Sequence, residues 1–173
     1  SWTGSRTSGV HNSETCPACY RPPMFSLTEP ALFTRLRGAR RVLVAGAGGG
    51  FDVYAGLPLA LALRSAGQEV HLATLSFSDL HGLDLDVWLD ADVAAIGPDT
   101  VARGDYFPER TLARWLAQQD LPSTVYAFPR TGVRPLRAAY RALAGHLGGV
   151  DALGMVLCLI NVGRCRPSSL GRS

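Results

Sequence analysis

A short apolar segment that runs directly into a glycine-rich loop is the feature that most constrains the fold of this chain. Residues 42–45 are apolar, and glycine fills four of the next five positions, Gly46, Gly48, Gly49 and Gly50. Glycine tolerates positive φ angles and lets a ligand approach the backbone, and a helix that starts here would offer free N–H groups to an anion. The pattern predicts a strand, an anion-binding turn and a helix.

The segments that follow complete a βαβ unit. Residues 57–66 form an apolar stretch with Pro58 in its first turn and Gly67 after its end, as is typical of a helix. Because this helix is apolar on nearly every face, we expect neighbouring elements to cover it well. Residues 70–77 read as a second strand with partial alternation. A crossover of this kind joins parallel strands and is almost always right-handed.

The same plan recurs in the second half of the chain. Residues 81–104 have a weak pattern that favours irregular structure with at most one short strand. A helix is predicted from Pro108 through Leu116, then a strand at 123–128, a helix at 136–147 and a strand at 150–162. These elements predict an α/β fold, a Rossmann-like three-layer sandwich with a mainly parallel sheet.

Composition divides the chain into three parts. Residues 1–30 are rich in Ser, Thr, Gly and Pro and predict a disordered leader, residues 31–162 predict the α/β domain, and residues 163–173 predict a disordered tail. At 173 residues and 47% hydrophobic content, the chain suits one domain with a substantial core.

Composition also limits the cellular location and the classes of partner that we expect. No apolar run reaches the roughly 18 residues that cross a bilayer, and the first residues lack the order of a signal peptide, which predicts a cytoplasmic protein with no membrane partner. The net charge of +3 is too small to decide whether nucleic acid is a partner. Nucleic-acid binding needs a clustered cationic face, which the basic ends of the chain could provide, but disordered arginine-rich tails are the simpler interpretation, so no nucleic-acid partner is expected.

The glycine loop only partly matches the dinucleotide fingerprint G-x-G-x-x-G, because Phe51 stands where the last glycine belongs. Asp79, the acidic residue that could bind a ribose, lies further than about 20 residues beyond the glycines. The chain has no lysine, which excludes a Walker loop. We therefore expect the loop to hold a phosphate or carboxylate, with a nucleotide or dinucleotide as the candidate cofactor, against the alternative of a purely structural turn.

Asp52 follows the glycines directly and is the leading polar candidate. A carboxylate there would repel a phosphate unless it binds a sugar hydroxyl, a metal or a substrate amine. Simple capping of the helix dipole is the competing interpretation.

A second loop is expected at the same edge of the sheet. Arg130, Thr131, Gly132 and Arg134 lie between the third strand and its helix, where guanidinium groups, a hydroxyl and helix-start amides suit a phosphate or carboxylate. Surface arginines that solvate a turn are the alternative.

No metal site is expected. Cys16 and Cys19 have the spacing of half a zinc knuckle, but the other half is missing. The cluster Asp79, His81, Asp84 and Asp86 fits no defined motif and reads as a solvated acidic loop. His71, on an apolar strand, reads as a core histidine. No nucleophile with recognisable spacing is present, and the catalytic residues stay unknown.

Five segments together resemble the family known as domain of unknown function 1152, over about residues 40–153. They are Val42-Leu43-Val44-Ala45-Gly46-Ala47-Gly48-Gly49-Gly50-Phe51-Asp52, Gly56-Leu57-Pro58-Leu59, Thr74-Leu75-Ser76-Phe77, Tyr106-Phe107-Pro108-Glu109 and Phe128-Pro129-Arg130-Thr131-Gly132-Val133. The family brings no established reaction. Its members are longer, and residues 159–164 depart from its pattern. With the unrelated leader, this departure predicts a truncated or misread product of a longer enzyme.

These observations predict a protein that binds an anionic small molecule, such as a nucleotide, between residues 46–52 and 130–134. Three alternatives stay open: an enzyme, a non-catalytic binding or regulatory module, and an inactive fragment whose unfinished sheet edge self-associates.

Overall fold

The computed structural model describes residues 30–49 and 51–157. It separates into two units, Ser1–Arg37 and Gly38–Ser173. Within the first unit, part of the segment that was assigned from sequence to the α/β domain forms helix α1, Ala31–Leu36. The leader to residue 29, Gly50, the last part of the predicted strand at 150–162 and the tail lie outside the described residues.

The second unit contains a six-stranded mixed sheet in the order β3-β4-β5-β2-β1-β6. The strands are β1 Arg41–Gly46, β2 Glu69–Leu75, β3 Trp88–Asp90, β4 Val93–Ile96, β5 Val125–Phe128 and β6 Ala152–Val156. Strands β6, β1, β2 and β5 run parallel, whereas β4 and β3 form an antiparallel hairpin beside β5. The sheet is therefore mostly parallel, as predicted.

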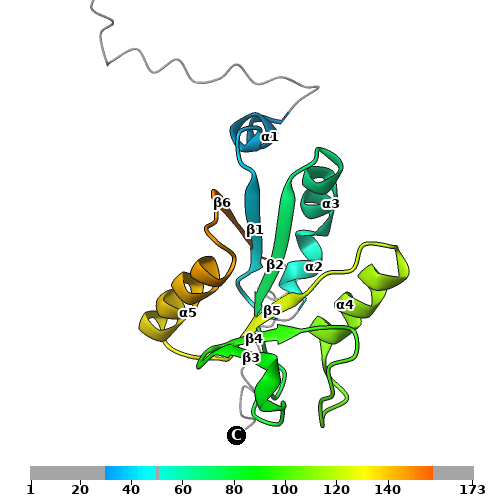
Figure 1. Ribbon diagram of the computed structural model, residues 1–173, viewed down its shortest axis with the longest axis vertical. Coiled ribbons are helices and arrows are strands. Elements are labelled where there is room, and N and C mark those ends of the chain that lie inside the picture. The colour runs from blue at the N-terminus through cyan, green and yellow to red at the C-terminus, as the bar shows by residue number, and fades with distance from the viewer. Residues whose placement is uncertain (1–29, 50, 158–173) are drawn as a thin grey trace, which may run out of the picture. The chain divides into compact units, whose positions relative to one another are not determined.

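Helices lie on both faces of this sheet. They are α2 Asp52–Ala55, α3 Leu57–Ser65, α4 Pro108–Gln118 and α5 Val133–His146, with a short 3₁₀ turn η1 at Leu85–Val87. Helix α5 lies on one side of the sheet, and α2, α3 and α4 lie on the other (Figure 1). The α/β class is confirmed by this arrangement.

The near-continuous apolar composition of β1, β2 and β5 follows from this double cover. On the α5 face, Leu43 and Phe128 pack with Leu143 in one buried cluster. On the opposite face, Ile96 and Ala127 belong to a second buried cluster. Because successive side chains of a strand point to opposite faces, each strand must supply apolar residues at every position rather than at alternate ones.

Two expectations need correction. The segment at 81–104, expected to hold at most one short strand, contains both β3 and β4, because pairing with β5 stabilises strands too short to have a clear pattern of their own. Helix α3 is less covered than its composition suggests: only Ala60 and Leu63 among its residues are buried. It packs on β2 with one face, and its remaining apolar side chains are partly or fully exposed.

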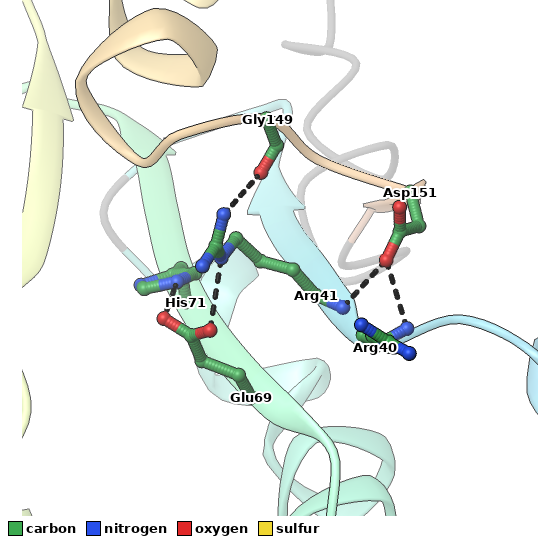
Figure 2. Close-up of polar contacts among 6 residues, drawn as sticks. All are labelled: Arg40, Arg41, Glu69, His71, Gly149 and Asp151. Atoms are coloured by element: carbon green, nitrogen blue, oxygen red, sulfur yellow. Dashed lines mark hydrogen bonds and ion pairs between the residues drawn. The ribbon is translucent and has the colours of Figure 1, made fainter.

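The strand starts are tied together at one edge of the sheet, which we call the amino edge. Asp151, just before β6, accepts hydrogen bonds at Oδ2 from the backbone N–H groups of Arg40, at 2.8 Å, and Arg41, at 2.9 Å. The Arg41 guanidinium donates to Glu69 Oε2 at 2.9 Å and to the Gly149 carbonyl at 3.1 Å. Figure 2 shows these contacts, which join the first residues of β1, β2 and β6.

His71 and Glu69 contact each other in this cluster, and their pKa values are lowered for different reasons. Burial lowers the pKa of His71, whose Nε2 lies 3.0 Å from Glu69 Oε1, although Glu69 opposes the shift. The hydrogen bond from Arg41 is the main cause that lowers the pKa of Glu69. His71 is thus a partly buried strand residue with a carboxylate partner.

Candidate functional site

The glycine loop lies at the opposite, carboxyl edge of the sheet and is held at both ends. The Ala47 N–H donates to the Val156 carbonyl at the end of β6, at 2.9 Å. The Gly49 carbonyl accepts from the Thr74 hydroxyl at 3.1 Å and from the Asp52 N–H at 2.9 Å. Gly49 has a φ of 134°, a value that disfavours any side chain.

Two of the glycines have a packing role that the sequence did not reveal. A Cβ atom added at Gly46 would lie 2.5 Å from the backbone nitrogen of Val53, and one added at Gly48 would collide with the carboxylate of Asp52. Glycine at these positions therefore lets the start of α2 pack directly against the loop. Close packing of the loop against the start of α2 therefore accounts for glycine at these two positions.

Asp52 is completely enclosed beneath this loop. Its exposed fraction is 1%, and neither carboxylate oxygen has a hydrogen-bond partner among the described residues. No side chain of the described residues caps α2 by a hydrogen bond. A side-chain hydrogen bond that caps the helix therefore does not account for Asp52. The favourable effect of the dipole of a four-residue helix is small compared with the several kcal/mol that it costs to bury an unpaired ion.

A second buried carboxylate, Glu109, lies in the first turn of α4, where the helix dipole favours negative charge. It is fully buried; Oε2 accepts a hydrogen bond from the Ser78 hydroxyl at 2.9 Å, and Oε1 has no partner among the described residues. Next to it, the Tyr54 hydroxyl donates to the Pro108 carbonyl at 2.7 Å. Burial, with a contribution from the charge of Glu109, raises the pKa of Tyr54 to about 12.

A cavity of about 510 Å³ opens beyond the carboxyl ends of β2 and β5. Its lining is mixed, with hydroxyl, carboxylate, imidazole, guanidinium and aromatic groups: Ser76, Phe77, Ser78, Asp79, Leu80, His81, Trp88, Ala91, Asp92, Pro129, Arg130 and Thr131. Three of the residues proposed from sequence, Asp79, Arg130 and Thr131, therefore share one cavity. Asp79 also accepts a hydrogen bond from the His81 N–H at 3.1 Å, which orders the loop after β2.

Phe77 connects this cavity to the glycine loop. A Cβ atom added at Gly49 would lie 3.2 Å from the Phe77 ring, so the ring packs closely against the loop. The guanidinium carbon of Arg130 lies 4.8 Å from the centre of the same ring, a cation–π distance. The two loops singled out in the sequence thus lie at one edge of the sheet with Phe77 between them.

The remaining residues proposed from sequence lie apart from the cavity. Gly132 immediately precedes α5, and Arg134 lies in its first turn; both are exposed, and neither lines the cavity. Gly50 lies outside the described residues. The structure thus brings Gly46, Gly48, Gly49 and Asp52 together in one loop, and Asp79, Arg130 and Thr131 together in the adjoining cavity.

Several lining residues were not singled out from the sequence. Ser76, Phe77 and Ser78 follow the end of β2, so their position at the carboxyl edge was a signal that could have found them. Trp88 and Asp92 come from the β3–β4 hairpin, whose strands the sequence pattern did not resolve. The burial of Glu109 depends on the packing of α4 and has no local signal in sequence.

Comparison of the chain with protein-family models, with curated proteins and with solved structures finds no match in any of the three. The resemblance to domain of unknown function 1152 therefore stays a prediction. Among the described residues, no helix is long and apolar enough to cross a membrane. Within the same residues, no group of three or more His, Cys, Asp and Glu side chains is arranged to hold a metal ion.

Proposed function

We propose that this chain is a Rossmann-like protein that binds an anionic small molecule, a nucleotide above all, at the carboxyl edge of its parallel strands. The observation that carries this proposal is the cavity beyond β2 and β5, which contacts the glycine loop through Phe77. Open α/β sheets bind their ligands outside the carboxyl ends of the strands.

The order of the parallel strands supports the Rossmann-like part of the proposal. Numbered along the chain without the β3–β4 hairpin, the parallel strands β5, β2, β1 and β6 have the order 3-2-1-4. The first four strands of a Rossmann fold have this order, with the ligand near the point where the direction of winding reverses. Here that point lies between β1 and β6, where the Ala47 N–H meets the Val156 carbonyl, whereas the cavity lies beyond β2 and β5. The glycine loop contacts both places, β6 through Ala47 and the cavity residue Phe77 through Gly49.

Size and chemistry support the nucleotide. A volume of about 510 Å³ lies within the roughly 300–1,000 Å³ range of small-molecule sites. Arg130 supplies a cation and Thr131 a hydroxyl for an anionic group, and Trp88 and Phe77 supply aromatic surface. Asp79 and Asp92 are acceptors suited to hydroxyl or amino groups of the ligand.

Thermal unfolding of the full chain with adenine nucleotides, dinucleotides and inorganic phosphate tests the proposal. A ligand at about 100 times its dissociation constant stabilises the folded state by about 2.7 kcal/mol. Arg130→Ala should weaken binding by about 1.5–3 kcal/mol, the range for a hydrogen bond to a charged group, whereas the exposed Arg137→Ala on α5 is the matched control. The proposal fails if no nucleotide shifts the unfolding transition.

An activity assay on each stabilising ligand, together with the unfolding data, separates the alternatives. Turnover of a stabilising ligand identifies an enzyme, and stabilisation without turnover identifies a binding or regulatory module. Leu153 and Met155 on the edge strand β6 are about half exposed, an observation that favours self-association as the second candidate. A melting transition that depends on protein concentration and ignores every ligand would favour that candidate.

A further inference from the structure

A second, smaller hollow lies where the start of α2 meets the start of α4. Its volume is about 180 Å³. The described residues that line it are Phe51, Tyr54, Asp105, Tyr106, Phe107, Pro108 and Thr111. None of them lines the large cavity beyond β2 and β5, so the hollow is a separate candidate site.

Three aromatic rings meet in this hollow without stacking flat. The centre of the Phe51 ring lies 5.5 Å from that of Tyr54, at an interplanar angle of 46°, and 5.9 Å from that of Tyr106, at 66°. Because rings at such angles do not cover one another, their faces can line a common space. The hydrogen bond from the Tyr54 hydroxyl to the Pro108 carbonyl, at 2.7 Å, holds one of the three rings in place.

Two of these rings remain in contact with solvent. Phe51 is 55% exposed, and Tyr106 is 48% exposed. Single exposed apolar side chains are ordinary on a protein surface, whereas neighbouring ones that form a continuous surface are typical of interaction sites. Phe51 and Tyr106 contact each other and therefore form such a surface.

The charges around the hollow favour a cationic ligand. Among the described residues that line it, Asp105 is the one with a formal charge, and it is exposed. Glu109 acts on the same rings, because its negative charge is the next cause after burial that raises the pKa values of Tyr54 and Tyr106.

A cation of the chain already contacts the neighbouring ring. The guanidinium carbon of Arg110 lies 5.3 Å from the centre of the Phe107 ring, and its Nη1 donates to the Thr100 carbonyl at 3.2 Å. Arg110 does not line the hollow. Within the part of the chain that the structure describes, no guanidinium lies over the rings of Phe51, Tyr54 or Tyr106.

We propose that this hollow binds the methylated ammonium group of a small quaternary ammonium compound of the choline type. The faces of aromatic rings attract cations, and proteins commonly bind quaternary ammonium groups in cages of such rings. Asp105 adds a negative charge to the lining. The volume of about 180 Å³ is below the roughly 300–1,000 Å³ of sites for drug-sized ligands, so it suits a small head group better than a whole nucleotide.

The test titrates the full chain with choline chloride and with tetramethylammonium chloride at constant ionic strength. NMR spectra should show saturable upfield shifts of the N-methyl protons, because the protons enter a space between aromatic rings. The matched control ligand is the neutral analogue of choline in which a tert-butyl group replaces the trimethylammonium group. It should bind at least about fivefold more weakly, which corresponds to one cation–π contact.

Five variants locate the binding in the hollow. Phe51→Leu and Tyr106→Leu each remove one ring and should weaken choline binding by about two- to fivefold. Asp105→Asn should weaken binding of choline and leave binding of the neutral analogue unchanged. The matched controls Trp115→Leu and Asp99→Asn change an aromatic residue and an acid outside the described lining, and they should bind choline as the parent chain does. All these positions are exposed, so the variants should keep the fold.

Three outcomes would overturn the inference: no saturable shift with either ammonium compound, equal affinity for choline and its neutral analogue, or unchanged choline binding in both ring variants. Tighter binding of trimethyllysine in a peptide than of choline would overturn the small compound as the occupant.

The inference is independent of the proposed function, and the two fail separately. Choline binding without a response to any nucleotide supports the ammonium site and removes the nucleotide. Nucleotide stabilisation that Phe51→Leu diminishes, together with no choline binding, would assign the hollow to the nucleotide site and remove the ammonium group.

Discussion

The carboxylates at the two edges of the parallel sheet differ in exposure and in hydrogen bonding. At the amino edge, Glu69 and Asp151 are exposed and each accepts two hydrogen bonds or close polar contacts from groups of the same chain (Figure 2). At the carboxyl edge, Asp52 and Glu109 are fully buried, and three of their four oxygens have no partner among the described residues.

The difference separates polar groups that stabilise the fold from polar groups that do not. The amino edge is complete, since its acids hold the starts of β1, β2 and β6 in register. The carboxyl edge keeps polar groups in a place where they cost stability, next to a cavity and a glycine loop. Buried polar groups without partners are rare in native structures, and a functional site is one of the explanations for them.

The largest effect should come from closing the space between the glycine loop and α2. Gly46→Ala places a methyl group against the backbone of Val53, which cannot move without displacing the helix. We expect the free energy of unfolding to fall by about 3 kcal/mol, the upper end of the cost of overpacking, as measured by urea denaturation. Gly145→Ala in α5 is the control, because a Cβ atom there meets nothing within 4 Å. Equal stability of the two variants would show that the loop does not pack on α2 as described.

A pair of acid variants tests the comparison itself. Asp52→Asn preserves the volume of a buried side chain and removes its charge. It should leave the free energy of unfolding unchanged or raise it, because a neutral amide costs less to bury without a partner than a charged carboxylate does. Asp151→Ala removes the acceptor that the N–H groups of Arg40 and Arg41 share, so it should lower the urea midpoint.

The essential result is a loss of stability in Asp151→Ala and no loss in Asp52→Asn. Chemical denaturation at pH 7 in low salt measures both under the same conditions. If Asp52→Asn destabilises the chain as much as Asp151→Ala does, then Asp52 has a structural partner, and the contrast between the edges disappears.

The sequence was sufficient for the elements that carry strong local patterns. The apolar run of β1, the segment from Pro108 to Leu116 in α4 and the proline and glycine that bound α3 each predicted the element that the structure shows. The β3–β4 hairpin was not predictable in the same way, because strands of three and four residues gain their stability from pairing with β5. The burial of α3 was also overestimated, because composition does not show how many of its side chains the neighbouring elements cover.

The candidate site was predictable where it depends on strand ends. Gly46 ends β1 and Gly48 and Gly49 follow it, whereas Arg130 follows β5, and parallel strands bring those ends to one edge. Contacts across the fold were not predictable from local sequence. The ring of Phe77 between the loops and the hydrogen bond from Ser78 to Glu109 both join segments that are distant in the chain. The sequence left the role of Asp52 open. The structure adds that its side chain is buried and that its carboxylate has no hydrogen-bond partner among the described residues.

The smallest effect should appear in the pH dependence of stability, and it belongs to the amino edge. Burial lowers the pKa of His71 below its ordinary value of 6.5, so protons bind more tightly to the unfolded chain. Its contribution to stability is therefore complete above pH 6.5 and is lost as the pH falls through the lowered pKa. Glu69 and Asp151 have pKa values lowered from 4.5 and 3.8 by their hydrogen bonds, and their contributions are lost at still lower pH. Urea midpoints measured from pH 8 to pH 3 should thus decline in two stages. His71→Gln should abolish the first stage and retain the second, and a first stage that persists in His71→Gln would assign it to another group.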